Sequence, residues 1–330
     1  MENEEMGDFI IPDNPGFVPV PDDPRNHSYG AIFGEEASLP RHFIHDMPSG
    51  MNTPYQGQVP CCVSCAFTFA NEFNSRKNDG NDITLSFRKI HADTGVYEAG
   101  RSIYQVAKYE KEKGQPQNKY CVNNVELTKS EFMCATLTPE GIEDASKRKI
   151  GPYSFLDVNN RNELMSAVFN SPVVFTAGGN NPDWRKSIIK QTSAAAWYHA
   201  FTCIGWDLDK GVWHIKNWWN DGVRMVDINY PLTGALSFRD LPDGEKNQMI
   251  KTVRVTGKND VYAISGNQKM RVPDSDTLHY FLGQIPIFSD TVEITQEELN
   301  GYTEGETVPS IKFMRALQPI CADIFLNEQG

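Results

Sequence analysis

The chain has 330 residues, of which 39% are hydrophobic and 11% aromatic, and its formal net charge at pH 7 is −12. This composition is typical of a globular protein with material for one large domain, or for a two-lobed domain and a small module. The acidic balance argues against nucleic acid or an anionic membrane as the main partner, because phosphate groups require clustered Lys and Arg. No apolar run approaches the roughly 18 residues of a membrane-spanning helix.

The N-terminus is acidic, and its apolar patch at residues 9–11 is too short for the core of a signal peptide. We therefore expect a cytoplasmic protein, or one released by lysis or another non-classical route. Seven cysteines do not settle the redox compartment. Cys121 and Cys134 could form a disulfide, and a wholly reduced protein fits equally well.

Residues 1–38 predict an extended acidic arm, because their prolines disfavour a helix. These prolines are Pro12, Pro15, Pro19, Pro21 and Pro24. Two interpretations remain open: a strap on the surface, or a short inhibitory segment that lies in the cleft of the domain that follows.

The most informative stretch is residues 56–73, where a turn-forming Gln-Gly and Pro segment leads into apolar residues spaced as in a buried helix. Cys62 falls in the first turn of this helix. Unpaired backbone N–H groups and the positive end of the helix dipole stabilise a thiolate there. The thiolate is the nucleophilic form of cysteine, so the pattern indicates a catalytic thiol. Zinc binding by Cys62 and Cys65 lacks a second ligand pair at matching spacing, and we expect no metal.

The next segments predict a helix at residues 103–113 with Ser102 as its N-cap, a helix at 162–169 and a strand at 171–176. Residues 115–160 are polar and show no readable pattern.

A nucleophilic cysteine needs a base and an orienting group, which are expected to be distant in sequence. The strand-like stretch 197–206 contains His199, and the stretch 212–219 contains Asn217. His214 is a competing imidazole, although a lone histidine in a strand is more often structural.

After about residue 250 the pattern changes to strands at residues 253–257 and 261–273, the latter folded back at a Gly-Asn hairpin, and then a short capped helix at 274–283. This segment is similar to a small module found in bacterial secreted proteins. Such a module would serve attachment, substrate presentation or packing support.

In the order Gln-Gly, Cys, His-Ala and Lys-Asn-x-Trp, residues 39 to 230 resemble the papain-like cysteine peptidases. Gln56 stands six residues before Cys62 and Glu72 ten residues after it, as in that family. The resemblance implies an α+β, papain-like two-lobed fold, in which a helical lobe faces a β-rich lobe across a cleft, with a small α/β module at the C-terminal end. The expected domains are the arm (1–38), the peptidase domain (39–250) and the accessory module with its tail (251–330).

The resemblance also implies roles for individual residues. Cys62 would attack the scissile carbonyl, His199 would pass the proton to the leaving amine, and Asn217 would orient the imidazole. Gln56 and the backbone N–H of Cys62 would form the oxyanion hole.

The expected activity is endopeptidase cleavage of an extended polypeptide, with no metal or organic cofactor. Gly100, with Ala99, would line the substrate groove, where bare backbone pairs with a peptide. Trp219 matches the indole that shields the His–Asn bond in relatives.

Several departures keep other readings open. Cys65 is an alternative nucleophile, because its neighbours echo the family motif, but choosing it leaves the glutamine three residues too far away. Pro60, Val63 and Trp218 replace residues that are usual in the family. An inactive papain-like protein with a structural or binding role in a larger assembly is therefore an alternative, as is a related thiol chemistry on cell-wall peptides or in acyl transfer.

Overall fold

A computed structural model describes residues 9–19, 39–79, 83–240, 251–258, 260–265, 268–272, 289–301 and 303–304. The contacts divide the chain into two compact units, residues 1–240 and residues 241–330. Among the described residues, no helix combines the length and the apolar character that crossing a membrane requires.

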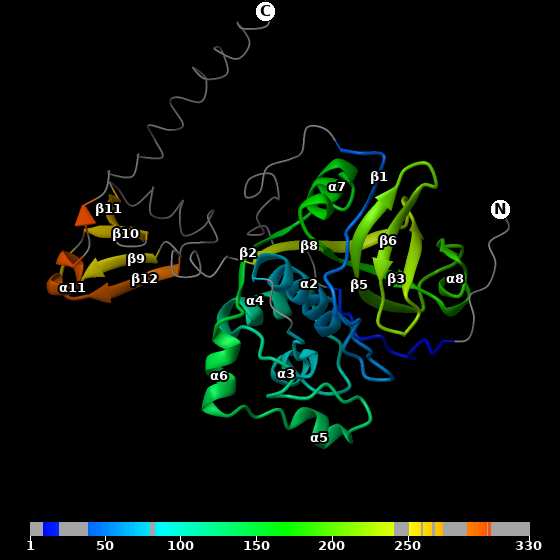
Figure 1. Cartoon of the computed structure of the whole chain (residues 1–330), viewed down its shortest axis with the longest axis horizontal. Helices are drawn as coiled ribbons and strands as arrows, with labels where there is room; N and C mark the ends of the chain where they lie inside the picture. Colours follow the sequence, from blue (N-terminus) through cyan, green and yellow to red (C-terminus); the bar gives the residue numbers. More distant parts are fainter. Residues whose placement is uncertain are drawn as a thin grey trace, which may run out of the picture. The chain divides into compact units, whose positions relative to one another are not determined.

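The first unit begins with a helical lobe (Figure 1). Its helices are α2 (Cys62–Asp79), α3 (Phe87–Asp93), α4 (Ile103–Lys113), α5 (Lys129–Met133) and α6 (Pro139–Ser146). Each of the last four helices has a serine or threonine at its N-cap, whose hydroxyl oxygen accepts a hydrogen bond from the backbone N–H three residues further on. These N-caps are Ser86, Ser102, Thr128 and Thr138. The helix expected at residues 103–113, with its Ser102 cap, is thereby confirmed.

The second lobe is built on a mainly antiparallel sheet of eight strands in the order β2-β8-β3-β5-β6-β7-β4, with β1 paired to β5. The strands are β1 (His42–Ile44), β2 (Ile150–Phe155), β3 (Val173–Gly179), β4 (Ile188–Ile189), β5 (Trp197–Asp207), β6 (Val212–Lys216), β7 (Val223–Asp227) and β8 (Leu232–Asp240). Two helices accompany them, α7 (Arg161–Asn170) and α8 (Asn181–Trp184). The helix expected at 162–169 and the strand expected at 171–176 are confirmed as α7 and β3.

Helix α2 lies between the other helices and the sheet in Figure 1, and its residues from Cys62 to Arg76 are all buried. Phe67 stacks on Phe238 of β8 with 5.5 Å between ring centroids, and Phe69 lies 5.6 Å from the ring of Trp218. Burying one such ring contributes about 2–3 kcal/mol. The all-round apolar pattern of residues 62–73 therefore reflects a helix enclosed between helices and sheet, and the expected two-lobed α+β architecture is confirmed.

Residues 115–160 are more regular than expected, since they contain α5, α6 and β2. The local signals were present but short: Thr128 and Glu131 form a capping box, and Thr138 precedes a proline in the first turn of α6. Cys121 and Cys134 are both free thiols, so the disulfide considered between them is not formed.

The second unit contains a five-stranded sheet in the order β12-β9-β10-β11-β13. Its elements are β9 (Lys251–Val255), β10 (Val261–Ser265), β11 (Gln268–Val272), β12 (Ser289–Ile294), α11 (Gln296–Asn300) and β13 (Thr303–Glu304). The antiparallel pairing of β10 with β11 confirms the expected hairpin strands. The helix expected at 274–283 lies outside the described residues.

Candidate active site

Cys62 is the first residue of α2, and one local and one long-range backbone hydrogen bond hold the loop before it in place. The N–H of Val59 donates to the carbonyl of Gln56 (3.0 Å), and the N–H of Gln56 donates to the carbonyl of Trp218 (3.1 Å). This places the Gln56 side chain beside the start of α2 and next to the segment that follows β6.

His199 in β5 and Asn217, directly after β6, are brought together by the antiparallel pairing of these strands. The Nε2 atom of His199 lies 2.7 Å from Oδ1 of Asn217, and both side chains are fully buried. The indole of Trp219 stacks on the imidazole at 4.5 Å between centroids. The ring is thus fixed at Nε2 and covered on one face.

The thiol of Cys62 lies against the same strand, because the N–H of Ala200 donates to its Sγ atom at 3.4 Å. Since Nε2 of His199 faces Asn217, Nδ1 is the ring nitrogen left for the thiol. The other two thiols of this stretch lie near each other, with 3.7 Å between the Sγ atoms of Cys61 and Cys65. The structure therefore brings Cys62, rather than Cys65, to the strand that carries His199.

His214 does not join this group. It is half-buried in β6 opposite Gly205 and Met225, and the described contacts of Asn217 are with His199 and Asp221 instead.

The N-terminal arm lies directly over this site. The carbonyl oxygen of Pro15 accepts hydrogen bonds from Nε2 of Gln56 (3.1 Å) and from the backbone N–H of Cys62 (3.2 Å). Residues 9–19, the dark blue segment in Figure 1, therefore place a peptide carbonyl on the two donors beside the thiol. Pro15, Gly16 and Phe17 are buried, whereas Asp13 and Val18 are exposed, so the described arm lies at the surface with its middle residues packed against the site.

The arm continues past the donors by pairing with the helical lobe. The N–H of Arg101 donates to the carbonyl of Gly16 (2.8 Å), and the N–H of Val18 donates to the carbonyl of Arg101 (3.0 Å). Two glycines permit this close approach. A Cβ atom at Gly16, whose φ is +102°, would lie 1.9 Å from the carbonyl oxygen of Pro60, and one at Gly100 would lie 2.5 Å from the carbonyl oxygen of Gly16.

Aromatic contacts hold both ends of the described arm. Phe9 stacks on Trp219 at 6.3 Å and lies 5.0 Å from the guanidinium of Arg224. Phe17 is buried and packs edge-on against Tyr198 at 6.5 Å.

Burial of the two side chains sets the charge of the site. It raises the pKa of the Cys62 thiol well above its ordinary value, against a smaller opposing effect of the hydrogen bond from Ala200. It also lowers the pKa of His199 to about 3, although the hydrogen bond with Asn217 acts in the other direction. In the covered state the two groups are therefore a neutral thiol and a neutral imidazole, which is the unreactive form.

The expected groove residues are found near the arm, but the backbone that pairs with it belongs to Arg101. Gly100 supplies room for the arm, and the carbonyl of Ala99 accepts a hydrogen bond from the guanidinium of Arg101. That buried guanidinium also donates to the carbonyl of His91 (2.6 Å) and to the Thr94 hydroxyl (2.9 Å), which orders the loop. Sequence reasoning missed Arg101, because nothing in the pattern separates a buried loop arginine from an exposed one.

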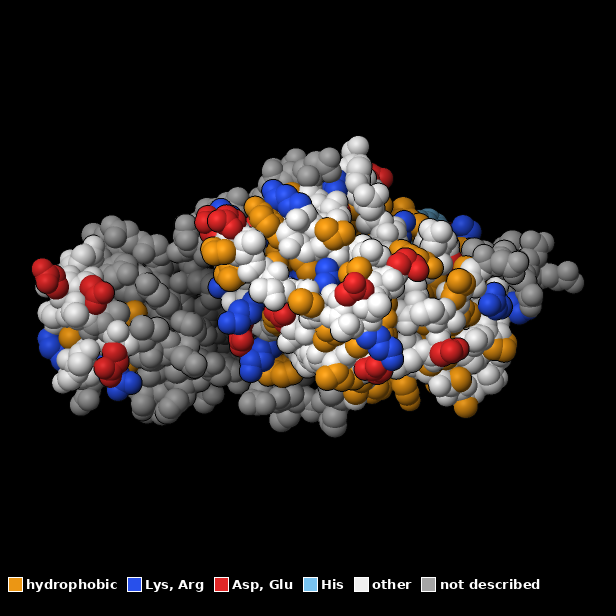
Figure 2. Space-filling model, turned by 90° about the horizontal axis from the view of Figure 1, so that it is seen from below, with side chains coloured by type: hydrophobic (Ala, Val, Ile, Leu, Met, Phe, Trp, Pro, Cys, Tyr) orange, Lys and Arg blue, Asp and Glu red, His pale blue; other side chains and the backbone are white. Residues whose placement is uncertain are grey.

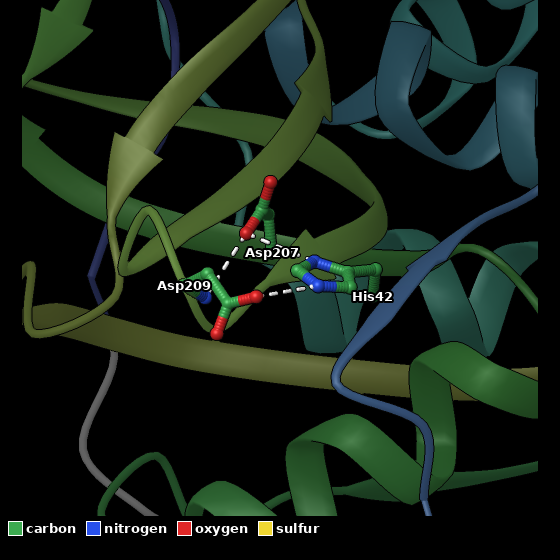
Figure 3. A group of neighbouring side chains, drawn as sticks. All are labelled: His42, Asp207 and Asp209. Atoms are coloured by element: carbon green, nitrogen blue, oxygen red, sulfur yellow. Dashed lines mark hydrogen bonds and ion pairs between the residues drawn. The ribbon is translucent and has the colours of Figure 1, made fainter.

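A second group of polar side chains, with ligand atoms within 4.8 Å of one another, consists of His42, Asp207 and Asp209 (Figure 3). The two ring nitrogens of His42 face one oxygen of Asp207 (3.0 Å) and one of Asp209 (2.7 Å). Arg41 and Lys210 pair with the same carboxylates. Both carboxylates therefore already have partners among these side chains, and the group forms a network of polar contacts between β1 and the end of β5.

No protein-family model matches the sequence, and no curated protein matches it. Solved structures do resemble the first unit, and they define the fold as that of the papain-like cysteine proteases. Xylellain, a cysteine protease from Xylella fastidiosa, superimposes with a TM-score of 0.59 and 18% identity over 72% of this chain and 99% of its own. Digestive procathepsins L2 and L3 from the larval midgut of Tenebrio molitor each give a TM-score of 0.51 at 16% identity, over 62% and 65% of this chain and 69% and 76% of their own.

Proposed function

We propose that this chain is a cysteine-type endopeptidase, and that residues 9–19 hold it as an inactive precursor. The thiolate of Cys62 attacks the carbonyl carbon of a peptide bond, and the oxyanion is stabilised by the side-chain amide of Gln56 and the N–H of Cys62. His199 transfers its proton to the leaving amine, which leaves a thioester on Cys62. His199 then takes a proton from water, whose oxygen attacks the thioester. The C–S bond breaks, which releases the carboxylic acid and restores the thiolate of Cys62 beside the protonated imidazole.

The observation that carries this proposal is the position of the Pro15 carbonyl oxygen. Two N–H donors converge on it at 3.1 and 3.2 Å, and one of them belongs to the residue that carries the thiol. A peptide carbonyl from a substrate would use the same donors, so an extended polypeptide is the substrate class that the site suits. The fold of xylellain and of the two procathepsins, which are named as proteases or proteinases, supports the same reaction class.

The surface agrees with a polypeptide partner rather than a polyanion. On the described part of the face in Figure 2, acidic and basic side chains are interspersed with hydrophobic ones. The chain as a whole is acidic, so long-range attraction to phosphate groups is not expected.

The first test is the reactivity of the cysteines once the arm is displaced. In a Gly16→Ala chain, limiting iodoacetamide at pH 6 should modify Cys62 well ahead of the other thiols, as read by peptide mapping. The chain that keeps Gly16 should react slowly with iodoacetamide at Cys62, because the arm covers this residue. Preferential labelling of Cys65 would assign the nucleophile to Cys65 instead. Equal labelling of all cysteines, or labelling of none, would favour the non-catalytic alternative.

Replacing Gln56 with alanine should lower kcat by roughly 10²-fold or more, with little effect on KM, because one of the two oxyanion donors is removed. The measurement is hydrolysis of a peptide substrate by Gly16→Ala chains with and without Gln56→Ala. Gln117→Ala is the matched control, since the Gln117 amide donates to Asp144 and not to the arm. A kcat that is unchanged in the Gln56 variant would reject the oxyanion assignment.

A further inference from the structure

The hydrogen bonds of the imidazole continue beyond Asn217 to a buried ion pair. The Nδ2 atom of Asn217 donates to Oδ2 of Asp221 at 2.8 Å. The same oxygen is 2.7 Å from NH1 of Arg224, and NH2 of Arg224 donates to the carbonyls of Trp184 (2.8 Å) and Lys186 (2.7 Å). The side chains of Asp221 and Arg224 are 1% and 0% exposed. This chain of contacts is therefore enclosed and firmly anchored to the backbone.

We infer that Asp221 is a positioning residue for the reaction, which acts on His199 through Asn217. The inference rests on the proposed function, and it adds a residue that touches neither the thiol nor the position of the substrate carbonyl. It also gives a role to the Asn-Asp-Gly turn at residues 220–222, which by itself resembles an ordinary surface turn.

The physical reason is the two-fold ambiguity of an amide. An asparagine amide can present either its oxygen or its NH₂ group to a neighbour. A carboxylate only accepts hydrogen bonds, so Asp221 binds the NH₂ group of Asn217 and turns Oδ1 toward His199. Nε2 of His199 must then donate, and Nδ1 remains available to take the proton of the Cys62 thiol. The flipped amide would favour a proton on Nδ1, and that tautomer cannot accept one from the thiol.

The charge of Asp221 contributes less than its geometry. Arg224 pairs with the same carboxylate oxygen at 2.7 Å, so the field of the pair at the imidazole is largely cancelled. The other described neighbours of the ring are apolar or aromatic: Trp184, Trp197, Phe201 and Trp219. An acceptor without charge should therefore serve almost as well as the carboxylate, whereas loss of the acceptor should free the amide.

The experiment compares three changes in the Gly16→Ala chain. Asp221→Asn keeps an acceptor oxygen in place, and Asp221→Ala removes it. Asp221→Ala with Arg224→Met removes both partners, so that no buried charge is left unpaired if the single variant fails to fold. The readouts are kcat and KM on a peptide, and the pH dependence of Cys62 alkylation. Asp144→Ala removes a carboxylate of α6 that pairs with Arg148, and it is the matched control for loss of a structural carboxylate.

We expect the two variants without the acceptor to lose about 10- to 100-fold in kcat, with KM little changed, and the acid limb of the alkylation profile to move to higher pH. Asp221→Asn should stay within about threefold of the parent, and Asp144→Ala should leave the alkylation profile in place. Alkylation profiles that coincide in the parent and in the folded double variant would overturn the positioning role. A parent whose Cys62 is no more reactive at pH 6 than an ordinary thiol would instead overturn the proposed function itself.

Discussion

Replacing Gly16 with alanine should raise the peptidase activity of the full-length chain by about 10²-fold. Gly16 has a φ of +102°, which residues with a side chain rarely adopt, and its added Cβ atom would lie 1.9 Å from the carbonyl oxygen of Pro60. Neither neighbour can move easily, because Pro60 leads directly into α2 and the Gly16 carbonyl is bonded to Arg101. The substitution therefore acts on the arm and leaves the residues of the proposed mechanism untouched.

The magnitude follows from two costs. A strained backbone conformation costs about 1–3 kcal/mol, and forcing extra volume into a packed contact costs about the same. Together they weaken the closed state by roughly 3 kcal/mol, and each 1.4 kcal/mol corresponds to about a tenfold change in its population. Displacement also takes the Pro15 carbonyl off the side-chain amide of Gln56 and the N–H of Cys62, which leaves both donors for a substrate carbonyl.

The assay is the initial rate of cleavage of a fluorogenic peptide or a denatured protein by purified chains. Asp13→Ala is the matched control, because Asp13 is an exposed residue of the same arm, and its rate should remain that of the natural chain. A synthetic peptide of residues 9–19 should inhibit the Gly16→Ala chain, and the same peptide with alanine at position 16 should not. Equal rates for the natural and Gly16→Ala chains would mean that the arm does not control activity.

The sequence predicted those helices and site residues whose signals lie in short stretches of the chain. The apolar spacing within residues 56–73 predicted a buried helix, which is α2, and the predicted N-cap Ser102 begins α4. The order of Gln56, Cys62, His199 and Asn217 indicated which residues to expect together. The structure indeed places Gln56 and Cys62 on one carbonyl, and His199 beside Asn217.

The sequence could not predict contacts that depend on where distant backbone lies. Proline composition indicated an extended arm, but nothing in it showed that the carbonyl of Pro15 would meet the side chain of Gln56, which is 41 residues away. Asp221 was not singled out by the sequence pattern at all. The only local signal was its position three residues before Arg224, a spacing that is as common on exposed surfaces as in buried pairs.

Replacing Cys62 with alanine should reduce kcat/KM of the Gly16→Ala chain by at least about 10⁴-fold, whereas Cys65→Ala should change it only a few-fold. Loss of the nucleophile removes the acyl-enzyme route altogether, and what remains is binding and the oxyanion donors. Cys65 is fully buried and lies 3.7 Å from Cys61 in the core of the helical lobe. Its truncation removes a small buried group, so the expected loss is one of stability.

The comparison is informative because the two cysteines share one helix and both are fully buried. Thermal unfolding of each variant separates loss of chemistry from loss of folding: Cys62→Ala should remain folded and be inactive, and Cys65→Ala should remain active, each with at most a modest fall in Tm. The reverse pattern would assign the nucleophile to Cys65. The six-residue spacing between Gln56 and Cys62 would then no longer support an oxyanion role for Gln56. If both variants keep the activity of the parent, the cleavage does not come from this thiol site, and the papain-like fold then serves binding or structure rather than hydrolysis.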